Sequence, residues 1–154
     1  MNVLKRRHRL AVPLMIVMLG ITGCAGHAAT ATPGAPEPAT VESIAGTDLH
    51  RVTLTEQAMD RLGIQTKPVQ AAPAVVPGAP KLTVIPVDAV IYDPKGQSWA
   101  YTVSDSRTFT RQAIVIDHID GKSAYLKSGP AVGAPVVTVG ASELLGAEYG
   151  VGEE

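Results

Sequence analysis

The sequence predicts a mainly β fold, a small antiparallel β-barrel or sandwich with one short helix. Short segments that alternate apolar and polar residues fill the chain from about residue 81 to 140, and turn-forming residues separate them. Aromatic residues are few, so Val, Ile, Leu and Ala must build most of the core. Only residues 54–62 place apolar side chains at helical spacing over more than a single turn.

The N-terminal residues predict an export signal. Four basic residues precede an apolar run from residue 10 to 21, which is shorter than the about 20 residues that a membrane-spanning helix needs. The run ends in Ile-Thr-Gly-Cys, residues 21–24, which resembles the lipobox of bacterial lipoproteins. The resemblance implies that residues 1–23 are a signal peptide, that cleavage follows Gly23, and that Cys24 carries a diacylglycerol on its sulfur. The alternatives are an ordinary signal peptide or a short anchor with an incidental cysteine.

Composition narrows the range of partners. Cys24 is the only cysteine, so its acylation would leave no thiol for a disulfide, a nucleophile or a metal site. From Cys24 onward, nine Lys or Arg face fourteen Asp or Glu, a formal charge of −5, which argues against nucleic acid or anionic lipid as the main partner. We therefore expect an extracytoplasmic lipoprotein, held to the membrane by its lipid and without another cofactor.

Residues 24–51 are small, Pro-rich and without apolar periodicity, and are expected to form a flexible tether in which His27 and His50 are solvated. A β-domain should occupy residues 52–146, followed by a frayed tail over 147–154.

The β-domain is expected to open with its helix. Thr53 and Glu56 form a capping-box pattern, and Gly63 stands where a helix end favours a left-handed backbone, so the helix should cover about 54–62. An edge strand containing Pro68 should follow, because proline lacks the N–H that a central strand needs.

An Ala/Pro linker at residues 71–80 leads into the other strands. The segment 81–92 reads as one strand, or as two short strands bent at Pro86. The remaining expected elements are a type I turn at 93–96, strands at 98–103 and 108–119, a hairpin turn at Asp120 and Gly121, strands at 122–128 and 135–140, and one helical turn near the C-terminus.

Three segments, residues 55–69, 82–103 and 111–145, resemble in this order parts of the periplasmic adaptor (membrane fusion protein) family of tripartite efflux pumps, especially the heavy-metal-efflux type. The sequence departs from the family pattern at two places: Pro130 stands where a leucine is usual, and Pro135 follows Ala134, where an acidic residue is usual. The positions that match the pattern are Gly63, Pro86, Ala89, Gly129, Gly133, Val136, Val137, Gly140, Ala141 and Leu144.

The matching segments correspond to the beginning and the end of the family's fold. Residues 71–80 stand in place of the barrel, lipoyl-like and hairpin domains that lie between them in the family. This resemblance implies a membrane-proximal domain alone, which docks on an inner-membrane transporter, with a full-length adaptor as a second candidate partner. The expected contact surface comprises the helix edge at residues 55–63 and the loop at 93–97.

Few residues suggest chemistry. Asp117, His118 and Asp120 form the one metal-like cluster. Asp117 and His118 are neighbours in a strand and should point to opposite faces, so they cannot both bind one ion without a bulge. His118 and Asp120 are therefore weak candidates for metal ligands, and the alternative is a polar strand end that enters a turn. No serine has a nearby base and no G-x-S-x-G occurs, so we expect no enzymatic activity. Trp99 and Tyr101 share a strand face and more often seal a core than form a docking patch.

The leading hypothesis is therefore a lipid-anchored, non-catalytic accessory of an efflux transporter. The alternative is a small extracytoplasmic lipoprotein that binds a metal ion or small ligand independently of a pump. A third possibility is a truncated adaptor whose β-domain folds but has lost its role.

Overall fold

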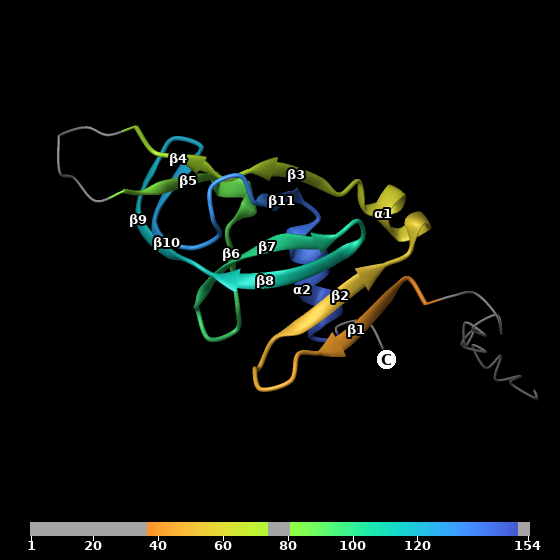
Figure 1. Cartoon of the computed structure of the whole chain (residues 1–154). Coiled ribbons are helices and arrows are strands. Elements are labelled where there is room, and N and C mark those ends of the chain that lie inside the picture. Colours follow the sequence, from red (N-terminus) through yellow and green to blue (C-terminus); the bar gives the residue numbers. More distant parts are fainter. Residues whose placement is uncertain (1–36, 74–80, 151–154) are drawn as a thin grey trace, which may run out of the picture. The chain divides into compact units, whose positions relative to one another are not determined.

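The computed structural model describes residues 37–73 and 81–150 of the chain (Figure 1). They form two antiparallel sheets, of seven and four strands, neither of which closes into a barrel. The predicted mainly β class is confirmed, and the arrangement is sandwich-like. Two short α-helices are present where the sequence predicts one.

The elements follow the chain in two groups on either side of residues 74–80. The first group consists of β1 (Ala39–Ser43), β2 (His50–Leu54), α1 (Glu56–Leu62), β3 (Gln65–Pro68) and β4 (Gln70–Ala71). The second group consists of β5 (Thr83–Pro86), the 3-10 helix η1 (Val87–Ala89), β6 (Ile91–Tyr92), β7 (Ser98–Asp105), β8 (Thr108–Ala113), β9 (Val115–Asp120), β10 (Ser123–Ser128), β11 (Pro135–Val139) and α2 (Ala141–Glu148).

The larger sheet has the order β1-β2-β8-β7-β11-β3, with β6 also pairing with β7, and the smaller sheet has the order β4-β5-β10-β9. The chain passes from the larger sheet to the smaller one at Val69, after β3, and at Ile114, after β8. Both residues are buried, because each turns its side chain into the apolar layer that the two sheets share. As predicted, Pro68 lies on an edge strand.

Two clusters of buried side chains form the core. The first packs α1 and α2 onto the larger sheet and comprises Val52, Leu54, Ala58, Ile91, Tyr101, Phe109, Val137, Ala141 and Leu144. The second joins the two sheets and comprises Val69, Ile85, Ala89, Ala100, Ile114, Ala124, Leu126 and Val136. The face of β7 that carries Tyr101 and the opposite face that carries Ala100 are thus both covered.

The predicted boundary of the tether, at residue 51, lies too far along the chain. Residues 39–43 form β1, which pairs with β2 over five residues, and β2 already begins at His50. Four of the five β1 side chains are exposed, so backbone hydrogen bonds rather than apolar contacts hold this strand, and it leaves no apolar alternation in the sequence. The expected signal peptide and residues 24–36 of the expected tether lie outside the described residues.

Helix α1 begins later than predicted and has a different cap. Thr55, not Thr53, is its N-cap, and the Thr55 hydroxyl accepts a hydrogen bond from the backbone N–H of Ala58. Thr53 belongs instead to β2, where its hydroxyl meets that of Thr108 at 3.2 Å. The predicted left-handed end at Gly63 is confirmed, with φ of 60°.

Several predicted turns are confirmed, but one predicted strand is divided. The backbone N–H of Gly96 donates to the Asp93 carbonyl at 2.8 Å, and Gly121 lies in the hairpin loop between β9 and β10. The segment 108–119, expected as one strand, breaks at Ile114 into β8 of the larger sheet and β9 of the smaller one.

The C-terminal part is more ordered than expected. The prediction was a single helical turn and a frayed tail over 147–154, whereas α2 continues to Glu148. The helix is held because Ala141, Leu144 and Glu148 turn one buried face toward the larger sheet.

Candidate functional site

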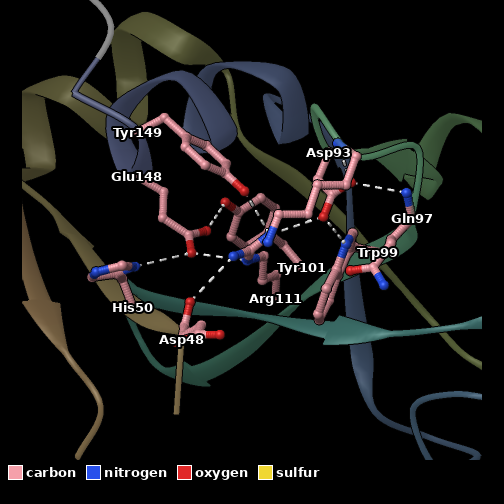
Figure 2. A network of polar contacts seen from close by, with 10 residues as sticks. Asp48, His50, Asp93, Gln97, Trp99, Tyr101, Arg111, Glu148 and Tyr149 are labelled. Carbon is pink, nitrogen blue, oxygen red and sulfur yellow. Dashed lines mark hydrogen bonds and ion pairs between the residues drawn. The ribbon is translucent and has the colours of Figure 1, made fainter.

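The most developed polar feature is a buried ionic cluster, made of Asp93, Arg111 and Glu148 (Figure 2). These residues come from the loop after β6, from β8 and from the end of α2, so they join three elements far apart in sequence. Each residue is at most 8% exposed. Charged side chains reach such burial only when they are paired, and the contacts among them explain their position.

The central contact is an ion pair between Arg111 and Glu148. Arg111 Nε lies 2.9 Å from Glu148 Oε1, at an angle that makes this contact an ion pair rather than an aligned hydrogen bond. The Tyr101 hydroxyl donates to the other oxygen, Oε2, and His50 Nδ1 lies 3.4 Å from Oε1. Burial, together with this bond to Glu148, raises the pKa of Tyr101 far above its ordinary value, so the phenol stays protonated as a donor.

Aromatic rings lie against the guanidinium of Arg111. Its Cζ is 4.5 Å from the centroid of the Trp99 ring and 5.3 Å from that of Tyr149. Arg111 Nη1 also donates to the Tyr149 hydroxyl at 3.0 Å, and Nη2 donates to the Asp48 carbonyl at 3.3 Å. The Nη atoms of the guanidinium therefore bond to a hydroxyl and a carbonyl group and π-faces lie against its plane, whereas Nε contacts Glu148 only as an ion pair.

Asp93 anchors the β6–β7 turn to this cluster. Its Oδ1 accepts from the backbone N–H groups of Lys95 and Gln97, and its Oδ2 accepts from Trp99 Nε1. Arg111 Nη1 is 3.9 Å from Oδ2. Burial alone would raise the pKa of Asp93, but the bonds from Gln97, Trp99 and Lys95, with the charge of Arg111, outweigh it and lower the pKa.

The role that the buried ionic cluster can fill is structural. Its charged groups are buried and face one another. What they do is fix the end of α2 and the β6–β7 turn on the larger sheet. The expectation that the chain is not an enzyme stays a prediction.

The metal-like residues lie elsewhere, on the β9–β10 hairpin. The pairing register shifts so that Asp117 is an extra residue of β9, a bulge that brings its carboxylate beside the following residue. His118 Nδ1 lies 2.7 Å from Asp117 Oδ2, and Lys127 Nζ lies 2.8 Å from Oδ1. Hydrogen bonds from Lys127 and His118 lower the pKa of Asp117, and the His118 ring stacks on Tyr125.

The bulge corrects the expectation that Asp117 and His118 point apart. His118 contacts Asp117 and not Asp120, so the structure does not join the two weak metal candidates. Within residues 37–73 and 81–150, no group of three or more His, Cys, Asp or Glu is placed to hold a metal ion.

The family-pattern residues occupy structural positions. Gly133 and Gly140 both have φ of 89°, and a Cβ on Gly140 would collide with the Ile64 side chain. Gly129 lies against Leu126 and Ile114, where a Cβ would be 3.0 Å and 3.1 Å from their nearest atoms. Among the other positions of the pattern, Gly63 ends α1, Pro86 ends β5 and Ala89 is fully buried in η1. The remaining positions are buried core residues: Val136, Val137, Ala141 and Leu144. Cys24 and Gly23 lie outside the described residues.

Sequence reasoning missed the buried ionic cluster, and it expected His50 to be solvated. A signal was present: Phe109 and Arg111 share one strand face, so an inward Phe109 implies a buried charge two residues later. Glu148 likewise lies four residues after Leu144, on the buried face of α2.

Comparisons with protein-family models, with curated proteins and with solved structures returned no match. Among the described residues, no helix has the length and apolar character needed to cross a membrane.

Proposed function

We propose that the protein is a lipid-anchored, extracytoplasmic accessory of a membrane efflux transporter, on which it docks an adaptor-like β-domain. The observation that carries this proposal is the pairing between the two parts of the chain that flank residues 74–80. Strands β2, β3 and β4 of the first part pair with β8, β11 and β5 of the second. In the adaptor family that the sequence resembles, the two ends of the chain likewise meet in the membrane-proximal domain.

The position of residues 74–80 supports the same proposal. They connect β4 and β5, which are antiparallel neighbours with Ala71 opposite Thr83. Since these strand ends lie side by side, the connection needs little chain, and longer insertions at such a point are tolerated in general. A domain of this topology can therefore lack the family's middle domains and keep both of its sheets.

Two regions are proposed for docking, the exposed side of α1 and the β6–β7 loop, which lie at opposite ends of β7 (Figure 1). Gln57 and Arg61 on α1 are exposed, as are Lys95 and Gln97 in the loop. The loop is presented on a fixed support, because Asp93 bonds to the backbone of Lys95 and Gln97. A rigid loop of this kind loses little conformational freedom when it binds a partner.

A crosslinked pull-down from native membranes, with an affinity tag after Glu154, tests this function. Recovery of a polytopic transporter above the level of a Cys24→Ser control is the expected result, and the mass of the N-terminal peptide reports acylation in the same sample. If only the acylated protein itself is recovered, the transporter proposal is wrong.

A further inference from the structure

A cleft of about 380 Å³ lies where the chain passes from the larger sheet to the smaller one. Its apolar wall is formed by Pro68, Val84, Ile85 and Pro86. Its polar lining comprises Lys67, Gln70, Asp88, Lys122 and Ser123. Small-molecule sites typically measure about 300–1,000 Å³, and the volume of this cleft lies within that range.

The charges that line the cleft favour an anion. From Cys24 onward acids outnumber bases by five, yet the cleft has two lysines and one acid. Lys67 comes from β3 and Lys122 from the β9–β10 turn. In the described part of the chain, neither ammonium group has a carboxylate within ion-pair distance, Asp88 included. Both therefore keep their hydrogen-bond donors for a ligand.

The walls of the cleft are held by backbone hydrogen bonds. The N–H of Val87 donates to the Lys122 carbonyl at 3.0 Å, which fixes the hairpin turn against η1. The N–H of Val69 donates to the Ala134 carbonyl at 2.9 Å, which fixes the bend between β3 and β4. A cleft bounded in this way is formed before a ligand arrives, so binding requires little reorganisation.

We propose that this cleft binds a small organic carboxylate, with the carboxylate between Lys67 and Lys122 and a short apolar body against Val84 and Pro86. Asp88 leaves the lining with a net charge of one, which favours a single anionic group over a dianion. The proposal does not depend on docking to a transporter, because it concerns a different part of the domain.

Titration of the full chain, purified in detergent and labelled with 15N, tests this proposal with sodium hexanoate as the probe. Saturable shifts of the amide signals of Gln70, Lys122 and Ser123 are expected. Hexanamide, the neutral analogue of the same size, should bind at least about tenfold more weakly, since it cannot form the charge-assisted hydrogen bonds. Equal binding of the two compounds, or no saturable shift with hexanoate, would overturn the proposal.

Charge variants provide matched controls. Lys67→Gln with Lys122→Gln should weaken hexanoate binding about tenfold or more, whereas Lys81→Gln with Lys95→Gln, exposed lysines outside the cleft, should leave it unchanged. Asp88→Asn should strengthen binding, because it removes the one negative charge from the lining. Weaker binding by Asp88→Asn, or equal losses in the two lysine pairs, would contradict the assignment. The unperturbed amide spectrum of each variant verifies its fold.

Discussion

Arg111 Nε on β8 lies 2.9 Å from Oε1 of Glu148, the last residue of α2. The side chains of the two residues are 6% and 1% exposed, so the contact is shielded from solvent. It fastens the C-terminal helix to a central strand of the larger sheet (Figures 1 and 2). The helix has only eight residues and is too short to be stable by itself, so this attachment matters for its stability.

Replacement of Arg111 by Ala should lower the free energy of unfolding by about 3–5 kcal/mol, because it leaves the carboxylates of Glu148 and Asp93 buried without their cation. Urea unfolding measures this change. Arg107→Ala is the control: this exposed residue of the β7–β8 turn should change stability by less than about 0.5 kcal/mol. A loss below about 1 kcal/mol for Arg111→Ala would show that the ion pair is unimportant.

A double replacement tests whether the stability lost on replacing Arg111 arises from the unpaired charge of Glu148. Arg111→Met combined with Glu148→Leu should be more stable than Arg111→Met alone, because the double variant removes one buried carboxylate together with its partner. The coupling free energy from the four unfolding curves should be at least about 1 kcal/mol. Additive effects would mean that the two side chains act independently.

The strand-rich class, the position of Gly63 and the two tight turns were predictable because they depend on local patterns and turn chemistry. Strand β1 was not, since its exposed residues leave no apolar alternation and it is held mainly by its backbone pairing with the neighbouring strand β2. The break at Ile114 was also hidden: an unbroken run of strand-forming residues does not indicate where a chain changes sheets.

The buried ionic cluster needed the tertiary fold to become visible. Asp93, Arg111 and Glu148 are separated by 18 and 37 positions, and nothing local indicates that they meet. The type I turn that begins at Asp93 was predictable, but the second role of Asp93 as an acceptor for Trp99 depends on the pairing of β6 with β7. Cys24, the strongest single sequence signal, lies outside the described residues.

Asp93 should contribute to stability in a pH-dependent way. Its pKa in the folded protein is lowered from 3.8, so the unfolded state binds the proton more readily. The stabilisation is present above that unfolded value and is lost as pH falls through the lower folded value. The difference in unfolding free energy between the wild type and Asp93→Asn should therefore be larger at pH 6 than at pH 2.5, as urea titrations at both pH values will show. A constant difference would contradict this account.

Two glycines, one directly before α2 and one within it, should respond oppositely to alanine. Gly140 precedes α2 with φ of 89°, and a Cβ there would collide with Ile64, so Gly140→Ala should cost more than about 1 kcal/mol. Gly146 lies within α2, and an added methyl group there would have no atom within 4 Å, so Gly146→Ala should stabilise by about 0.5–1 kcal/mol. Melting temperatures measure both effects, and a rise for Gly140→Ala would show that the tight approach to Ile64 is not required.

Site-specific photocrosslinking in native membranes tests the central claim, docking on a transporter, most directly. A photoreactive amino acid is placed at Gln57 on α1, at Lys95 in the β6–β7 loop, and, as a control, at exposed Ser128 at the end of β10. If the domain docks on a transporter, a light-dependent adduct with one polytopic membrane protein is expected from Gln57 or Lys95, and none from Ser128. No adduct from either docking position, or equal yields from all three, would contradict it.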